Sequence, residues 1–444
     1  MQTKYLKEIV GAGGMLMESE AVKMKQNSEN NFWVGAATAA HQVEGNNVYS
    51  DFWRMEHLPH SSFVEPSMDA VDHYNRYEED ITLLKNAGCS AYRFSIEWAR
   101  VEPRQGCYDQ DAIGHYRKVL EFCHSLDMIP IVTLHHFSSP AWLISKGGWG
   151  KKNVAEYFGA YCGFVAKELG SLMPYICTIN EANMGYQLQK VAQDVMKARQ
   201  REGGVQVGVN LDIKVLLKGM LEQGKAFHCS PFGVNTFLTP RNEKKEKFVM
   251  QAHQAGQAAI KKASPYSKVG LTLSLFDYQP VDGGEEAVKK LWHEDFGFYL
   301  PYIMEDDFLG VQNYSRKLVG PEGAREPASD MPCTQMGYED YPASIGHVLR
   351  KVAKEFPSEL IVTENGIGTE DDDRRCQFIR EAYEGVMAAR ADGVPVRGYI
   401  HWSLLDNFEW QAGYAKTFGL IAVDRKTQKR YPKKSLDVLG ELIQ

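Results

Sequence analysis

Residues 74–96 decide the fold, and they begin with the stretch Tyr74-Asn-Arg-Tyr-Glu-Glu-Asp-Ile-Thr-Leu-Leu-Lys-Asn-Ala-Gly88. Apolar residues recur there every three or four positions and a glycine follows, which predicts an α-helix that stops at the glycine. The next stretch, Ala91-Tyr-Arg-Phe-Ser-Ile96, is short and rich in apolar and aromatic residues, which is typical of a buried strand. Residues 74–96 therefore predict one helix followed by one strand.

The same alternation continues along the chain. Helical patterns over residues 157–169, before Gly170, and over residues 378–391, before Gly393, repeat the design. Eight strand-like runs lie at residues 32–37, 91–96, 129–134, 175–179, 269–275, 308–311, 360–363 and 396–400. Eight alternations of strand and helix predict an α/β fold, a single (β/α)8 TIM barrel with long βα loops.

The length of 444 residues alone would suggest about three domains of about 150 residues each. We find no Pro-rich or Gly/Ser-rich linker and no short repeat, and one barrel with insertions can exceed about 400 residues. We therefore expect residues 29–444 to form a single TIM-barrel catalytic domain and residues 1–28 to be an N-terminal extension outside it. Residues 1–23 leave two interpretations open, a misassigned upstream start and a loosely packed helix.

Charge and hydropathy argue against two classes of partner. The chain has 50 Lys and Arg against 57 Asp and Glu, a net charge of −7, whereas nucleic-acid binding needs clustered positive charge. No apolar run approaches the about 18 residues of a membrane span. Glu8, Glu18 and Glu20 interrupt what would be the apolar core of a signal peptide. We expect no nucleic-acid or membrane partner; the oligomeric state is not readable.

Cysteine and histidine spacing gives no sign of a metal site. Eight scattered cysteines without a Cys-x-x-Cys motif predict reduced thiols and a cytoplasmic protein. His135 and His136 are adjacent on a predicted strand, so their side chains alternate and cannot both face one ion. We expect no metal and no cofactor.

A barrel places its chemistry where the strands end on one face. The polar residues at these ends are Gln42, Glu44, Arg93, Glu97, His135, His136, Asn180, Glu181, Asn313, Tyr314, Glu364, Asn365, Trp402, Glu409 and Trp410. Two carboxylates stand out, because Glu181 and Glu364 directly follow apolar strands, where a charge is costly without compensation. Their strands, the fourth and the seventh, are three apart in a ring of eight, so we expect the two side chains to face each other.

Paired carboxylates across a pocket are the minimal machinery of glycoside cleavage, in which one is protonated and the other ionised. Repulsion and burial would separate the pKa values of Glu181 and Glu364. Position alone leaves a structural alternative, in which the two carboxylates cap helices or pair with arginines. The eight tryptophans of the chain favour a sugar site, because sugar rings stack on aromatic side chains.

Several ordered motifs resemble the retaining β-glycosidases of glycoside hydrolase family 1, the β-glucosidase family. The similarity covers nearly the whole chain. The motifs are Phe32-Trp-Val-Gly-Ala-Ala-Thr-Ala-Ala-His-Gln-Val-Glu-Gly45, Tyr92-Arg-Phe-Ser-Ile-Glu-Trp98, Thr133-Leu-His-His136, Thr178-Ile-Asn-Glu181, Val362-Thr-Glu-Asn-Gly366, His401-Trp-Ser-Leu-Leu-Asp-Asn-Phe-Glu-Trp410 and Phe418-Gly-Leu-Ile-Ala-Val-Asp424.

The resemblance implies a two-step displacement through a covalent glycosyl-enzyme. It implies that Glu364 is the nucleophile, held by Arg93 and Tyr314, and that Glu181 is the acid and then the base. The two carboxyl groups of a retaining enzyme lie about 5 to 5.5 Å apart. Asn180 would bind the sugar 2-OH. The further implied sugar contacts are Gln42, His136, Glu409 and Trp410 for the other hydroxyls, and Trp402 for the ring face.

The resemblance also bears on the substrate. Family members that act on 6-phosphorylated sugars replace Glu409-Trp410 with serine and basic residues, and the related thioglucosidases have glutamine in place of Glu181. The family usually has Pro, Asn and Trp where this chain has Ala182, Gln312 and Phe137. We expect an exo-β-glycosidase for terminal unphosphorylated β-D-glycosides in small molecules or oligosaccharides, β-glucosides first, with β-galactosides and β-fucosides left open. Two alternatives stay open, a mainly transglycosylating enzyme and a non-catalytic carbohydrate-binding barrel.

Overall fold

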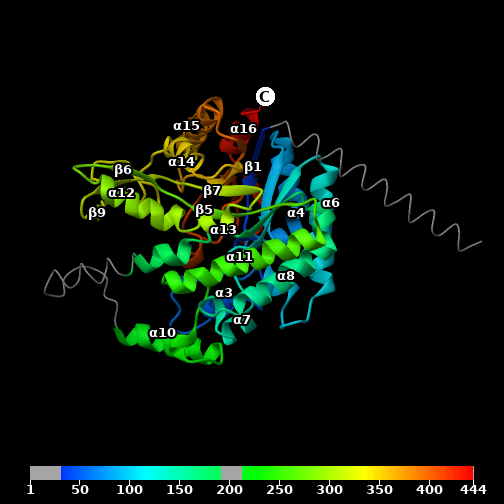
Figure 1. The fold of residues 1–444 in the computed structure, drawn as a ribbon. Coiled ribbons are helices and arrows are strands. Elements are labelled where there is room, and N and C mark those ends of the chain that lie inside the picture. Colours follow the sequence, from blue (N-terminus) through cyan, green and yellow to red (C-terminus); the bar gives the residue numbers. More distant parts are fainter. Residues whose placement is uncertain (1–31, 191, 193–212, 444) are drawn as a thin grey trace, which may run out of the picture.

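The computed structural model describes residues 32–190, 192 and 213–443, and its centre is a closed barrel of eight parallel strands (Figure 1). Each of the eight predicted runs forms one strand, so the predicted fold class is confirmed. The extension expected at residues 1–28 lies outside the described residues. The barrel strands are β1 (Trp33–Ala37), β2 (Ala91–Ser95), β3 (Ile129–His135), β4 (Tyr175–Ile179), β5 (Lys268–Ser274), β7 (Phe308–Gln312), β10 (Glu359–Asn365) and β11 (Val396–Trp402).

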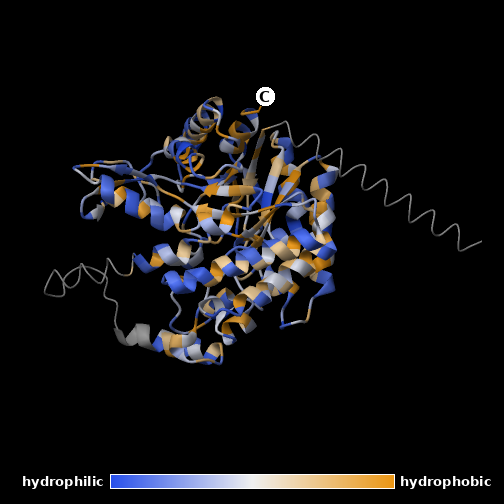
Figure 2. Cartoon of the chain, viewed as in Figure 1, coloured by the Kyte–Doolittle hydropathy of each residue, from blue (hydrophilic) through white to orange (hydrophobic). Residues whose placement is uncertain are grey.

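The helices cover the barrel, with their hydrophobic sides toward the strands (Figure 2). The main helices are α4 (His73–Asn86), α6 (Gln110–Ser125), α8 (Val154–Leu169), α10 (Ile213–Ala226), α11 (Glu243–Ala263), α12 (Glu285–Trp292), α14 (Ser344–Val352), α15 (Asp372–Ala391) and α16 (Lys434–Glu441). The shorter ones are α2 (Ala40–Val43), α3 (Asp51–Glu56), α5 (Trp98–Val101), α7 (Ala141–Ser145) and α13 (Leu300–Ile303).

The predicted helix ends are correct, but their glycines act differently. Gly88 and Gly393 have φ values of 108° and 90°, a left-handed conformation that ends α4 and α15 at little steric cost. Gly170 instead has a φ of −58° and opens a short 3₁₀ helix, η2 (Gly170–Leu172). The sequence therefore locates all three ends, although only two of the glycines have the expected conformation.

Two small sheets lie outside the barrel. The loops after β5 and β7 contribute β6 (Asp277–Pro280), β8 (Arg316–Gly320) and β9 (Gly323–Ala324), which pair in the order β6-β8-β9. Near the carboxyl end of the chain, β12 (Ile421–Val423) pairs with β13 (Arg430–Pro432). Because β6 and β8 follow the carboxyl ends of β5 and β7, the first sheet stands at the mouth of the barrel.

Aromatic side chains close the opposite end of the barrel. The rings of Trp33 and Tyr175 meet edge to face, with centroids 4.7 Å apart, and Phe308 packs 5.6 Å from Tyr175. Close packing of strands also matters here, since a Cβ at Gly35 would lie 1.9 Å from the carbonyl oxygen of Ala91. The bottom of the barrel is therefore packed core, and the space for chemistry lies at the mouth.

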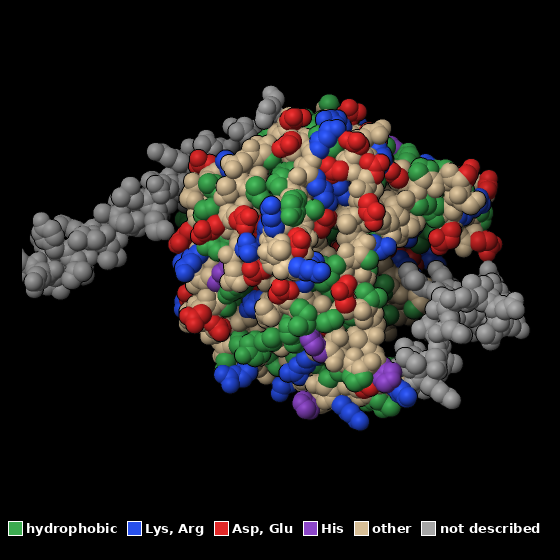
Figure 3. All heavy atoms as spheres, turned by 180° about the vertical axis from the view of Figure 1, so that it is seen from behind, with side chains coloured by type: hydrophobic (Ala, Val, Ile, Leu, Met, Phe, Trp, Pro, Cys, Tyr) green, Lys and Arg blue, Asp and Glu red, His purple; other side chains and the backbone are tan. Residues whose placement is uncertain are grey.

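The exterior is that of a mixed-charge protein, with acidic and basic side chains interspersed on the face shown in Figure 3. Among the described helices, none combines the length and the apolar character needed to cross a bilayer. All eight cysteines are free thiols, as the scattered spacing predicts, and only Cys107 and Cys333 are exposed.

Candidate active site

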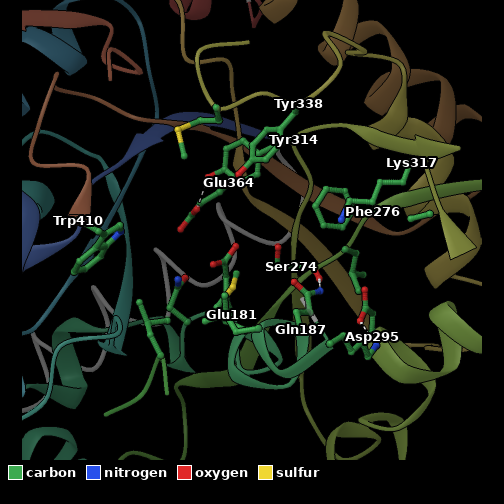
Figure 4. A pocket seen from close by; sticks show the side chains of 18 of the residues that line it. Glu181, Gln187, Ser274, Phe276, Asp295, Tyr314, Lys317, Tyr338, Glu364 and Trp410 are labelled. Carbon is green, nitrogen blue, oxygen red and sulfur yellow. Dashed lines mark hydrogen bonds and ion pairs between the residues drawn. The ribbon is translucent and has the colours of Figure 1, made fainter. Parts of the chain in front are cut away.

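A cavity of about 1090 Å³ opens at the carboxyl ends of the barrel strands (Figure 4). Eight of the ten site residues expected from the sequence line it: His136, Asn180, Glu181, Tyr314, Glu364, Trp402, Glu409 and Trp410. The other two, Arg93 and Gln42, lie behind this lining and contact it. The topology places β4 and β10 with β5 and β7 between them, so Glu181 and Glu364 come from strands three apart, as predicted.

Glu364 is held by two donors, one on each carboxylate oxygen. Arg93 on β2 donates from Nη1 to Oε1 at 2.6 Å, and the Tyr314 hydroxyl donates to Oε2 at 2.6 Å. Burial raises the pKa of Glu364, while the Arg93 charge and the Tyr314 hydroxyl lower it. With its two oxygens paired in this way, Glu364 is the carboxylate that ionises first.

Glu181 stands just after β4 on a strained turn, with a φ of 41°. Its backbone N–H donates to Thr272 Oγ1 at 2.8 Å, and the N–H of Ala182 donates to the Thr272 carbonyl at 3.0 Å. A proline at position 182 could not make the second of these bonds. The departure from the family pattern at Ala182 thus adds a backbone hydrogen bond that fixes this turn.

The environment of Glu181 favours its protonated form. Burial, followed by the charge of Glu364, raises the pKa of Glu181 to about 8. Ser274 and Arg93 oppose this shift. Within this pair, Glu181 is therefore the group that favours the protonated form, and Glu364, held by Arg93 and Tyr314, is the group that favours the ionised form.

Three donors converge on the side-chain oxygen of Asn180. Arg93 Nη2 lies at 2.6 Å, Gln312 Nε2 at 2.7 Å and Thr272 Oγ1 at 3.2 Å from Asn180 Oδ1. These donors fix the orientation of the amide, whose Nδ2 lies 3.2 Å from His136 Nε2. Burial and the nearby Arg93 charge hold the pKa of His136 well below its usual range, so Nε2 accepts from Asn180.

Gln312 has a role that its sequence position did not reveal. The sequence indicated only that a longer amide occupies the place of the usual asparagine. In the structure this amide is fully buried and reaches Asn180 Oδ1 and Thr272 Oγ1. Gln312 is therefore part of the support of Asn180.

Gln42, expected to contact a sugar hydroxyl, reaches the lining of the cavity through Glu409, and its Oε1 has no hydrogen-bond partner among the described residues. It is fully buried on α2, and its Nε2 lies 2.9 Å from the Phe408 carbonyl, 3.1 Å from Asn407 Oδ1 and 3.3 Å from Glu409 Oε2. Its amide hydrogens are thus committed to the segment that carries Glu409. Burial, and then the charge of Glu364, raise the pKa of Glu409 to about 8.

Aromatic rings form the wall around Glu409. The indole of Trp402, at the end of β11, lies nearly parallel to the His136 ring at 5.6 Å, and the indole of Trp410 is also nearly parallel to this ring, at 6.1 Å. Phe137 packs against Trp410 at 5.2 Å and lines the cavity without offering a donor. Flat apolar faces beside polar groups are typical of a sugar site.

The adjacent histidines point to different environments, as the strand alternation predicts. His135 is buried, bonds Ser139 Oγ at 3.0 Å and packs on Trp149, whereas His136 lines the cavity. Within the described part of the chain, no three His, Cys, Asp or Glu side chains are grouped so as to hold a metal ion.

The individual residues on the side of the cavity opposite Trp410 were not predicted. This side is formed by residues from the loops after β4, β5 and β7, and Figure 4 shows several of them across the carboxylate pair from Trp410. Those labelled are Gln187, Ser274, Phe276, Asp295, Lys317 and Tyr338, and Lys190 and Tyr278 both bond Asp295. Apart from Ser274, which ends β5, none of them directly follows a barrel strand, so strand ends alone could not identify them.

Comparison with known proteins gives matches along nearly the whole chain. Residues 24–200 and 295–444 match the profile of glycosyl hydrolase family 1. The crystal structure of β-glycosidase BGL167 is similar with a TM-score of 0.84 and 42% identity, covering 92% of this chain and 95% of that one. Beta-glucosidase A of Thermotoga maritima is 30% identical over 457 residues, 93% of this chain and 97% of its own length. A 6-phospho-beta-galactosidase of Staphylococcus epidermidis is 28% identical over 474 residues, 95% of this chain and 99% of its own length.

Proposed function

The chain belongs to glycosyl hydrolase family 1 and is a β-glycosidase, and we propose that it removes single terminal, unphosphorylated β-D-glycosyl residues with retention of configuration. β-Glucosides are its first substrates. The observation that carries this proposal is the contrast between Glu364, paired with Arg93 and Tyr314, and Glu181, whose pKa is raised to about 8 in the same cavity. Retaining glycoside hydrolysis needs one ionised and one protonated carboxyl group in this relation.

In the first step, Glu364 attacks the anomeric carbon while the bond to the leaving oxygen breaks, and Glu181 gives its proton to that oxygen. The product is a covalent glycosyl-enzyme. In the second step, Glu181, now ionised, takes a proton from water, the water oxygen attacks the anomeric carbon and Glu364 is released. Arg93 and Tyr314 support both steps, because they orient the carboxylate and stabilise it as the leaving group.

The sugar is held by groups that are fixed before it binds. Asn180 Nδ2 donates to the sugar 2-OH, and Arg93, Gln312 and Thr272 together hold the amide in that orientation. His136, Glu409 and Trp410 contact the other hydroxyls, and Trp402 supports the ring. Gln42 also contacts a hydroxyl, through its Oε1, while its Nε2 orients Glu409. The reaction needs no cofactor.

We also propose that residues 29–444 act as one catalytic domain, with residues 1–28 as an extension, in the cytoplasm. The barrel strands that carry the site run from Trp33 to Trp402, so no cut within them leaves a complete cavity. Free, mostly buried cysteines are typical of a reducing compartment.

Discrimination against a 6-phosphate is the first test, because a 6-phospho-beta-galactosidase also resembles this chain and family membership does not decide the point. The described lining includes two cations. Lys317 lies on the side away from Trp410, and Lys190 lies on that side too, because it bonds Asp295. A phosphate dianion would therefore meet Glu409 without a basic partner. We expect 4-nitrophenyl β-glucoside to exceed its 6-phosphate about 10³-fold in kcat/KM, since a dianion that loses its water without gaining a cationic partner is costly to bind.

The same assay extends to 4-nitrophenyl β-galactoside, β-fucoside, β-xyloside and β-glucuronide. Equal rates with the phosphorylated and the unphosphorylated glucoside would contradict the proposed substrate class. Absence of hydrolysis across the whole panel would contradict the proposed reaction itself.

The pH dependence of kcat/KM should be bell-shaped. As pH rises through the Glu181 pKa of about 8, Glu181 loses the proton that the leaving oxygen needs, so activity falls. As pH falls, Glu364 becomes protonated and cannot attack. The measurement is kcat/KM for 4-nitrophenyl β-glucoside from about pH 4 to about pH 10.

A control is needed because the pKa of Glu409 is also raised to about 8. The alkaline limb should persist in Glu409→Gln and disappear in Glu181→Gln. The reverse result would assign the alkaline limb to Glu409 and contradict the acid role of Glu181.

A further inference from the structure

Two lysines line the cavity beyond Glu181, and only one of them has an ionic partner. Lys190 pairs with Glu294 at 2.8 Å and with Asp295 at 3.1 Å. Lys317 on β8 has neither a hydrogen bond nor an ion pair with any described residue, and its Nζ lies 3.9 Å from the centroid of the Phe276 ring. Lys317 is thus a half-buried cation whose contact is the face of an aromatic ring.

The nearby acids do not satisfy this cation directly. Asp295 is 1% exposed, and both its oxygens are engaged, Oδ1 by Lys190 and Oδ2 by the Tyr278 hydroxyl at 2.5 Å. Burial lowers the pKa of Lys317, which shows that the charges of Asp295 and Glu326 do not fully offset its loss of solvent. Removing a cation from water without a partner is costly, so a bound anion beside Lys317 would be favourable.

The walls around Lys317 are aromatic. Phe276 and Tyr338 both line the cavity, and their rings meet edge to face at 6.4 Å and 78°. The cavity volume of about 1090 Å³ slightly exceeds the range of about 300–1,000 Å³ for pockets that enclose drug-sized ligands. Room for a leaving group therefore remains beside the sugar, between flat apolar faces and one ammonium group.

We propose that the preferred leaving group is an aromatic ring bearing a carboxylate, with the ring against Phe276 and Tyr338 and the carboxylate paired with Lys317. The proposal rests on the proposed function and specifies its substrate class as β-glycosides of carboxylated phenols. A singly charged carboxylate matches the one unpaired ammonium group, and the nearby acids Asp295, Glu322 and Glu326 disfavour any second negative charge. A neutral leaving group would leave Lys317 unpaired.

The test compares two β-glucosides whose leaving groups differ only in charge, those of 4-hydroxyphenylacetate and 4-hydroxyphenylacetamide. The methylene group separates the substituent from the ring, so the two phenols have similar acidity. They are therefore similar as leaving groups, and a difference in kcat/KM reports the contacts of the substituent. We expect the wild type to favour the acid over the amide about tenfold in kcat/KM, mainly through KM, as a charge-assisted contact predicts. In Lys317→Met, which keeps an unbranched side chain over Phe276, this ratio should fall to about one.

Two further measurements test the same ion pair without relying on Lys317→Met alone. Lys317→Arg keeps the charge and should keep the preference. In the wild type, added salt should reduce the ratio of acid to amide, because the ion pair is screened.

The outcomes separate the two proposals. If the wild type hydrolyses both glucosides with equal kcat/KM, or if Lys317→Met keeps the full preference for the acid, the carboxylate proposal is wrong and the glycosidase remains. If the wild type hydrolyses neither of them nor 4-nitrophenyl β-glucoside, the proposed function fails too.

Discussion

Glu364→Ala is expected to lower kcat on aryl β-glucosides by about 10⁵-fold, the scale of losing a nucleophile that acts as part of a unit. Without the carboxylate, no glycosyl-enzyme forms, and Arg93 and Tyr314 lose the group they orient. The shortened side chain leaves space on the face of the sugar from which Glu364 attacks. Azide or formate that enters this space should restore part of the turnover and give a glycosyl product of inverted configuration.

The matched control is Glu359→Gln, a change of another glutamate on β10. Glu359 lies at the opposite end of the strand, where it pairs with Lys268 at 2.6 Å and with Arg397. This variant should keep turnover, which separates loss of the nucleophile from damage to the strand. Wild-type turnover in Glu364→Ala would refute the assignment of the nucleophile.

The fold was predictable because its signals are local. Strands buried on both faces appear as short apolar runs, and each of the eight barrel strands carries this signal in the sequence. The conformation of Gly170 was not predictable. Whether a glycine adopts a left-handed conformation or opens a 3₁₀ helix depends on the loop that follows it. The strand predicted at residues 360–363 is shorter than β10, which continues through Glu364. Its end was missed because polar residues at the barrel mouth interrupt the apolar pattern.

The site was predictable in the part that strand ends supply. Asn180 and Glu181 directly follow β4, Glu364 lies near the end of β10, and Tyr314 lies two residues past β7. Barrel topology therefore brings these residues together. Lys317 and its neighbours come from loops with no periodic pattern, and their convergence depends on how those loops fold. The sequence shows that a longer amide, Gln312, replaces the usual asparagine. Its hydrogen bond to Asn180 could not be predicted, because this bond depends on where the longer side chain extends in the folded site.

Glu181→Ala should impair the enzyme in a way that depends on the leaving group. For alkyl glucosides, whose leaving oxygen needs a proton, we expect a loss of about 10² to 10⁴-fold in kcat/KM. The leaving group of 2,4-dinitrophenyl β-glucoside, 2,4-dinitrophenolate, departs without protonation, so for this substrate the rate of the first step should change little. The second step should then become limiting, because no base activates water, and the glycosyl-enzyme on Glu364 should accumulate.

Azide distinguishes this variant from Glu364→Ala. In Glu181→Ala the nucleophile is intact, so azide attacks the glycosyl-enzyme from the face opposite Glu364 and the product keeps the β configuration. Water needs Glu181 as a base in the second step, whereas azide is already an anion and needs none. Turnover of the dinitrophenyl substrate should therefore rise with azide concentration. The anomeric configuration of the two azide products, determined by NMR, should therefore be opposite. A β product from Glu364→Ala and an α product from Glu181→Ala would mean that the two roles are reversed.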